Sequence, residues 1–114
     1  MSTTNNQLEK GVEKYFVAEM KKAMPPGTQI IKYEARRGEP DRICLLPGGR
    51  AIFVELKRPG KNLRDEQERA FERLVSLGFE VHLINSRELV DSFVKCLVQT
   101  EPKTYYDNMF PNQV

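Results

Sequence analysis

The spacing of hydrophobic residues changes several times along the chain, and each spacing predicts an element. From about residue 6 to residue 23 they recur every three or four positions, as in an amphipathic helix. Pro25-Pro26-Gly27 follows and is expected to end this helix. The predicted apolar stripe consists of Leu8, Val12, Tyr15, Phe16, Met20 and Ala23.

Three β-rich segments follow, at residues 28–35, 41–46 and 50–57. The last of them contains Ile52, Phe53, Val54 and Leu56 as a near-continuous apolar run, which is typical of a buried strand. Pro40 favours extended backbone in the residue before it and fixes where the middle strand begins. The pattern therefore predicts three consecutive strands after one helix.

A second helix is predicted to begin near Asn62 as its N-cap and to end at Gly78. One member of its apolar stripe is polar: Gln67 is either a hydrogen-bonded core amide or a site residue. Residues 79–84 form a short apolar strand, and Ser86 is expected to cap a last helix. The predicted order is α-β-β-β-α-β-α, an α/β protein. The stripe of the second helix is Leu63, Gln67, Ala70, Phe71, Leu74 and Leu77, and that of the last helix is Leu89, Val90, Phe93, Val94 and Leu97.

Length and composition are those of one globular domain. The chain has 114 residues, of which 39% are hydrophobic and 30% charged, and no apolar run approaches the length that spans a bilayer. The first residues lack the basic and apolar regions of a secretory signal, so we expect a cytoplasmic protein without a membrane partner. Residues 1–98 are expected to form the domain. Residues 99–114 have no periodicity and are expected to be a tail, whose aromatic residues Tyr105, Tyr106 and Phe110 either dock on a partner subunit or belong to a flexible end.

Charge is unevenly distributed along the chain. Residues 32–64 hold nine basic and four acidic side chains, a net charge of +5, whereas the whole chain is +2. A basic region of this kind suits a polyanion such as DNA, and the alternative is a solvated surface of mixed charge. Cys44 and Cys96 lie in apolar runs and are expected to be buried free thiols. A single histidine, His82, excludes a multi-histidine site and is expected on the solvent side of its strand or hydrogen-bonded there.

Asp41, Glu55 and Lys57 are the candidate chemical groups. Glu55 and Lys57 are two positions apart in a strand and therefore project from the same face. If Gly48-Gly49 formed a plain two-residue turn, Asp41 would face Leu56 from the wrong side. A site needs a connection of three or five residues, or a bulge, which shifts the pairing by one.

Two carboxylates that converge beside a backbone carbonyl make an oxygen-only site, which suits Mg²⁺ or Mn²⁺ better than Zn²⁺. Lys57 is then placed to orient water or to neutralise developing charge. The structural alternative is an ion pair of Glu55 with Lys57, and of Asp41 with Arg42 or Arg58. Two further acids, at positions 9 and 13, are expected at the edge of the first helix's buried face.

These residues give the chain a recognisable motif. It resembles the PD-(D/E)XK nuclease signature and, more narrowly, the stand-alone, phage-type VRR-NUC (viral-type replication and repair nuclease) domain, over residues 8 to about 97. That family implies a restriction-endonuclease-like αβββαβ core with a central mixed sheet flanked by helices. The motif consists of Gly38, Pro40, Asp41 and Arg42, then Glu55 fourteen residues after the aspartate, then Lys57 and Gln67.

The resemblance also implies roles for individual residues. Asp41 and Glu55 would be metal ligands, the carbonyl of Leu56 a further ligand, Lys57 the catalytic lysine, and Gln67 a support of the site. The family's helix acid corresponds to Glu9 or Glu13, and the family pattern favours Glu9.

The expected function is that of a Mg²⁺- or Mn²⁺-dependent endonuclease that hydrolyses DNA phosphodiesters. A small domain has little surface for reading base sequence, so we expect a preference for branched DNA and, as in Holliday-junction resolvases, a homodimer. The alternative is a non-catalytic DNA-binding or dimeric scaffold module on the same fold. The complete set of Asp41, Glu55 and Lys57 favours the nuclease.

Overall fold

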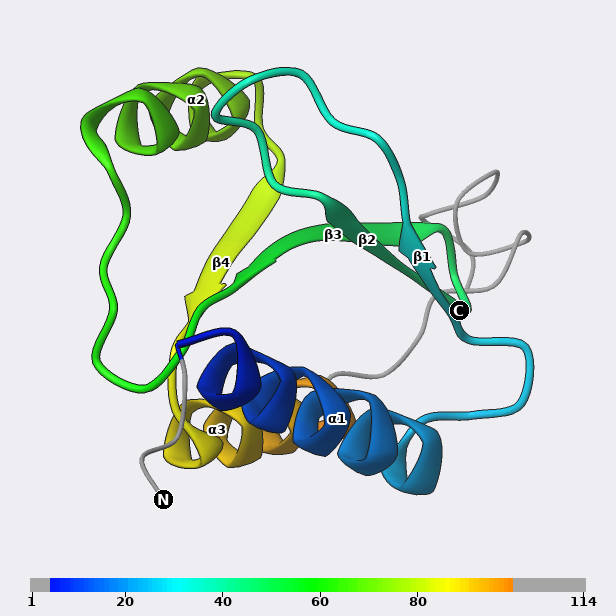
Figure 1. The fold of residues 1–114 in the computed structure, drawn as a ribbon. Helices are drawn as coiled ribbons and strands as arrows, with labels where there is room; N and C mark the ends of the chain where they lie inside the picture. Colours follow the sequence, from blue (N-terminus) through cyan, green and yellow to red (C-terminus); the bar gives the residue numbers. More distant parts are fainter. Residues whose placement is uncertain (1–4, 100–114) are drawn as a thin grey trace.

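The computed structural model describes residues 5–99 and confirms the predicted order of elements (Figure 1). The expectations for the first four residues and for residues 100–114, including the aromatic tail, lie outside this range. The elements are α1 (Asn5–Ala23), β1 (Gln29–Lys32), β2 (Arg42–Leu46), β3 (Arg50–Leu56), α2 (Asp65–Ser76), β4 (Glu80–Ile84) and α3 (Arg87–Gln99).

The four strands form one mixed sheet in the order β1-β2-β3-β4. β1 pairs with β2 and β2 with β3 in antiparallel fashion, whereas β4 runs parallel to β3. In Figure 1, α1 and α3 lie side by side against one face of the sheet, and α2 lies on the other side of it. The expected α/β architecture, a central mixed sheet flanked by helices, is therefore confirmed.

The core lies between the sheet and the α1–α3 pair. Buried residues alternate along β3, so Ile52, Val54 and Leu56 point into this core while Phe53 and Glu55 point to the opposite face. The apolar run predicted as wholly buried is thus fully buried on one face only. The rings of Phe16 and Phe93 meet with their centroids 5.9 Å apart. The helices contribute Val12, Phe16, Met20, Val90, Phe93 and Leu97 to this core.

Helix α2 begins later than the sequence predicts. Its first helical residue is Asp65 and its N-cap position is Arg64, so the assignment of Asn62 as N-cap is wrong. The reason is a loop that is tied down before the helix starts: the amide of Gly60 donates to the carbonyl of Asn85 at 3.2 Å, and the Asn85 side chain donates to the carbonyl of Lys61 at 2.9 Å. The residues between Lys61 and Asp65 then connect this loop to the start of α2.

Only two residues of α2, Gln67 and Ala70, are buried. Leu77, predicted on its buried stripe, is 72% exposed. The last helix agrees better with prediction, because the Ser86 hydroxyl accepts a hydrogen bond from the Leu89 amide at 3.1 Å and caps α3.

The two cysteines differ in their surroundings. Cys44 is a buried thiol in β2, as predicted, and burial raises its pKa to about 12. Cys96 is exposed, contrary to prediction, because α3 turns Phe93 and Leu97 toward the core. His82 is partly exposed on β4, where its ring lies edge-on to Phe93 and its Nε2 lies 3.9 Å from Glu80 Oε2. None of the helices between residues 5 and 99 is long and apolar enough to cross a membrane.

Candidate active site

The turn between β2 and β3 sets the register on which the site depends. Leu46 pairs with Arg50, which leaves a three-residue connection in which both Gly48 and Gly49 have positive φ. Arg42 then pairs with Val54. Continued by one residue, this register places Asp41 opposite Glu55, as the sequence required of a functional site. The simple two-residue turn, which would have faced Asp41 with Leu56, is excluded.

Glu55 is a nearly buried carboxylate with few neutralising contacts. Its side chain and that of Lys57 are each 12% exposed, and Lys57 Nζ lies 3.6 Å from Glu55 Oε1. Burial raises the pKa of Glu55, and the charge of Asp41 raises it further. The Lys57 ammonium and a hydrogen bond from the Asp41 backbone oppose this rise without cancelling it. The ionised form of Glu55 is therefore less favourable in the folded protein than in water.

Tyr33 holds the segment that leads to Asp41. Its hydroxyl donates to the carbonyl of Pro40 at 2.6 Å, and its amide donates to the carbonyl of Asp41 at 3.0 Å. Burial raises the pKa of Tyr33, and the carboxylates of Glu39, Asp41 and Glu55 add to the effect. Sequence reasoning missed this residue. The signal exists only in the strand register, which carries Tyr33 opposite Asp41 once β1 is paired with β2.

Gly38 lets the preceding loop lie directly on the first turn of α2. Its φ is +84°, and a Cβ at this position would come within 2.8 Å of the Glu66 carbonyl oxygen. On the same side, Arg37 Nε lies 2.7 Å from Glu66 Oε2. The glycine of the motif is thus required by a close approach of backbones that fixes where α2 begins.

Gln67 projects from that first turn toward Glu55. Its amide oxygen accepts from the Arg64 backbone at 2.9 Å, and its Nε2 donates to Glu55 Oε1 at 3.4 Å. The side-chain amide is therefore both buried with hydrogen-bond partners and in contact with a candidate site carboxylate. The two alternatives left open by the sequence, core amide or site residue, do not exclude each other here.

The alternative in which Asp41 forms an ion pair with Arg42 or Arg58 does not hold. Arg42 projects to the opposite face of the sheet, where its Nη2 lies 2.6 Å from Glu13 Oε1, and no ion pair of Asp41 occurs among residues 5–99. The Arg42 side chain is 7% exposed, and its Nε has no hydrogen-bond partner in the described part of the chain. The other half of the alternative, the contact between Glu55 and Lys57, is present.

The predicted carboxylates of three elements meet around one cavity of about 190 Å³ between α1 and the site end of β2 and β3. Lys57 and Gln67 are not among the residues that line the cavity, but both contact Glu55, which is. Two lysines to which the sequence assigned no site role, Lys10 and Lys32, also line the cavity, because α1 and β1 flank it. The lining residues are Glu9, Lys10, Glu13, Lys32, Asp41, Arg42, Glu55 and Leu56.

The donor atoms around this cavity suit a divalent cation by their chemical type. Within residues 5–99, no three carboxylate, imidazole or thiol groups converge closely enough to hold one ion. The acids and the backbone of Leu56 that border the cavity nevertheless offer only oxygen donors. Burial and the charge of Asp41 raise the pKa of Glu55, so a cation bound beside it would favour the ionised carboxylate. The chemistry of the lining therefore fits a hard divalent cation.

Comparison with known proteins points to one family. The family model described as VRR-NUC domain matches residues 9–88, a range that contains every residue lining the cavity. "Putative nuclease p44" of Acyrthosiphon pisum secondary endosymbiont phage 1 is 38% identical over 81 residues, which cover 71% of this chain and 86% of that protein. A solved structure described as a VRR_NUC domain is 31% identical, with a TM-score of 0.65, over 76% of this chain and 94% of that one.

Proposed function

The chain belongs to the VRR-NUC domain family and is a nuclease by that membership, and we propose that it is a divalent-metal-dependent endonuclease acting on DNA phosphodiester bonds. The observation that supports this most directly is the apposition of Asp41 and Glu55 across β2 and β3, with Lys57 Nζ 3.6 Å from Glu55. A non-catalytic scaffold would have no need to keep this costly, nearly buried set.

Asp41, Glu55 and the carbonyl of Leu56 would hold a Mg²⁺ or Mn²⁺ ion in the cavity. When bound, the ion supplies Lewis-acid polarisation of the phosphoryl group and of water. Gln67 keeps Glu55 in one orientation, since its amide is fixed at its other end by the Arg64 backbone. The Lys57 ammonium, on the same strand face as Glu55, orients water or neutralises the negative charge that develops on the phosphate.

The ion pair of Glu13 separates the roles of the two helix acids. The Glu13 carboxylate is engaged by Arg42 at 2.6 Å, whereas Glu9 lines the same cavity and makes no ion pair among the described residues. We therefore assign Glu9 as the additional metal ligand of α1 and Glu13 as the counter-charge of the buried Arg42 guanidinium. Glu13 thereby ties α1 to β2 beside Asp41.

Branched DNA is the proposed substrate, and a homodimer the proposed assembly. One domain offers one set of Asp41, Glu55 and Lys57, and a two-fold dimer would present two such sets at a fixed separation. A surface for pairing is available around the end of α2, where Val75, Leu77 and Phe79 are 58%, 72% and 46% exposed.

The first prediction concerns the metal. With linear, flap, splayed and four-way DNA as substrates, the protein should cleave in Mg²⁺ or Mn²⁺ and stop in EDTA, because its donors are oxygens. Gel analysis of end-labelled strands measures the products, and the Asp41→Asn variant serves as the control for contaminating nucleases.

Undiminished cleavage in chelator, or cleavage with Zn²⁺ alone, would contradict the assignment of an oxygen-only site. DNA binding without cleavage under all these conditions would instead favour the scaffold module.

A further inference from the structure

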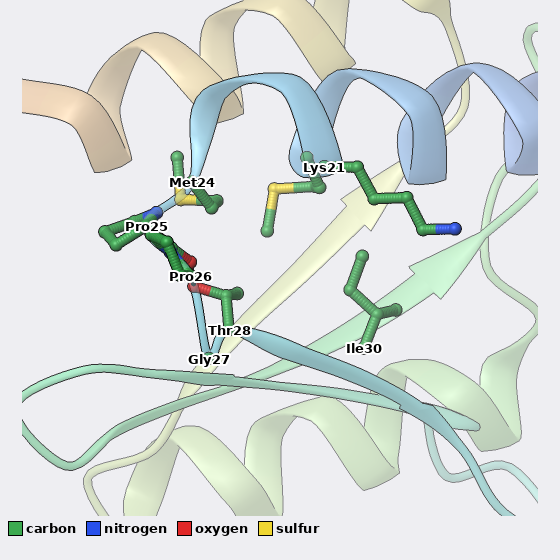
Figure 2. A pocket seen from close by; sticks show the side chains of 8 residues that line it. Lys21, Met24, Pro25, Pro26, Gly27, Thr28 and Ile30 are labelled. Carbon is green, nitrogen blue, oxygen red and sulfur yellow. Dashed lines mark hydrogen bonds between the residues drawn. The ribbon is translucent and has the colours of Figure 1, made fainter.

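Three cavities that share lining residues follow the seam between α1 and β1, beginning with the acidic cavity, and together they are called the groove. The acidic cavity shares Glu13, Lys32 and Arg42 with a second one of about 390 Å³. The second shares Lys21 and Ile30 with a third of about 240 Å³ at the end of α1. Figure 2 shows this third cavity, with Met24, Pro25 and Pro26 at one end and Lys21 extending from α1 above Ile30.

Three exposed lysines line the groove: Lys10 and Lys21 come from α1, and Lys32 comes from β1. None of the three forms an ion pair within residues 5–99. The acid in the middle of the groove, Glu13, is neutralised by Arg42. The middle of the groove is therefore positive, and its one carboxylate without an ion pair on α1, Glu9, lies at the end where the metal is proposed.

We propose that this groove binds the phosphodiester backbone of the DNA strand that adjoins the cleaved bond, with Lys10, Lys32 and Lys21 each contacting a phosphate. This rests on the proposed function. Cavities of a few hundred Å³ are the size of small-molecule sites, so they hold one strand rather than a duplex. The positive charge of the groove, and the residues that its middle cavity shares with the acidic cavity, favour a polyanion that leads to the reacting phosphate.

The groove also limits the length of strand that is bound. Beyond Lys21 the lining consists of Met20, Met24 and the Pro25-Pro26-Gly27 turn, which offer no cation. We therefore expect about three phosphate contacts from the groove, in addition to those at the reacting phosphate. Phosphate contacts of this kind raise affinity without reading base sequence.

The test compares two triple variants of equal net charge. Lys10→Ala/Lys21→Ala/Lys32→Ala removes the groove lysines, and Lys14→Ala/Lys22→Ala/Lys95→Ala removes three exposed lysines that line none of the three cavities. Both carry Asp41→Asn so that the DNA stays intact. Fluorescence anisotropy with a labelled four-way junction and a linear duplex gives the affinity from about 50 mM to about 200 mM salt.

The groove variant should lower the slope of log affinity against log salt by about 2 to 3, close to 0.9 per lost phosphate contact, and the control by less than about 1. Equal slopes for the two variants would overturn the proposal.

Cleavage by the same triple variants with Asp41 restored is measured beside wild type. The groove variant should raise KM more than it lowers kcat. If wild type cleaves but the groove variant behaves as the control, only the groove assignment fails; if wild type does not cleave, the proposed function fails.

Discussion

The ionised Glu55 carboxylate lowers the stability of the folded protein. Because burial and the charge of Asp41 raise its pKa, the ionised form is less favourable in the folded than in the unfolded protein. This penalty is absent below the ordinary carboxyl pKa and grows as the pH rises through that value toward the raised pKa of the folded protein. Glu55→Gln should therefore be as stable as wild type, or more stable, at neutral pH in EDTA, and lose this advantage in acid.

DNA cleavage should be lost in the acid variants even though their stability is kept. Glu55→Gln and Asp41→Asn should abolish cleavage, and Lys57→Ala should lower it by about 10²- to 10⁴-fold, as expected for loss of a group that assists proton transfer or charge neutralisation. Thermal melts in EDTA and cleavage assays in Mg²⁺ on the same preparations measure both effects. A large loss of stability in both acid variants would indicate instead that the acids serve a structural ion-pair network.

Substitutions of Glu9 and Glu13 on α1 should also affect stability and cleavage differently. Glu13→Gln leaves the buried Arg42 guanidinium without its counter-charge and should cost about 2 kcal/mol. This is less than for a fully buried pair, because the Glu13 side chain is 35% exposed. Glu9→Gln should leave the free energy of unfolding within about 0.5 kcal/mol of wild type but abolish cleavage. Urea titrations and cleavage assays test this, and the reverse pattern would make Glu13 the metal ligand.

At the scale of elements, the site depends on how the loop before β2 meets α2. Gly38→Ala would add strain at φ +84° and place a methyl group 2.8 Å from the Glu66 carbonyl. The first turn of α2 must then shift and carry Gln67 away from Glu55. We expect a loss of more than about 2 kcal/mol together with reduced cleavage.

Gly78→Ala is the matched control for Gly38→Ala. Its φ is +91°, but a Cβ there meets no atom within 4 Å. It should cost about 1 to 2 kcal/mol from backbone strain alone and leave kcat unchanged. Equal effects of the two substitutions on stability and cleavage would show that the contact with Glu66 does not position the site.

The sequence was sufficient for the order of elements because hydrophobic spacing reports local structure directly. It also showed that Asp41 could reach Glu55 only through a shifted turn, which the three-residue connection supplies. The pairing of Arg42 with Glu13, the clamp by Tyr33 and the position of Lys10 beside the acids could not be predicted. Each depends on how elements far apart in sequence lie against one another, which periodicity does not encode.

The same limit explains the error at the start of α2. Asn62 is a good N-cap residue by type, but the hydrogen bonds of Gly60 and Lys61 with Asn85 hold the preceding loop elsewhere. Tertiary contacts outweigh local capping preference here.

At the scale of the whole molecule, the two sides of the sheet are covered unequally. α1 and α3 pack against one face of the sheet and contribute many buried residues. On the other face lies α2, in which only Gln67 and Ala70 are buried. Val75, Leu77 and Phe79 remain exposed around the end of α2, and Phe79 packs edge-on to Phe53 of β3. An exposed apolar region of this kind suits an interface better than a solvated surface.

The last prediction is that cleavage of four-way junctions exceeds cleavage of linear duplex and depends on dimerisation. One set of Asp41, Glu55 and Lys57 cuts one strand per encounter, and resolving a junction takes paired cuts on two strands of like polarity. A two-fold dimer supplies them by holding identical sites at a fixed separation.

Light scattering should report a dimer at micromolar concentration. Leu77→Asp, which charges a 72% exposed position away from the site, should yield monomer and reduce junction cleavage more than duplex nicking. The exposed substitution Lys95→Ala on α3 is the control. A stable wild-type monomer that cuts both substrates at equal rates would leave a metal-dependent nuclease without selection for branched DNA.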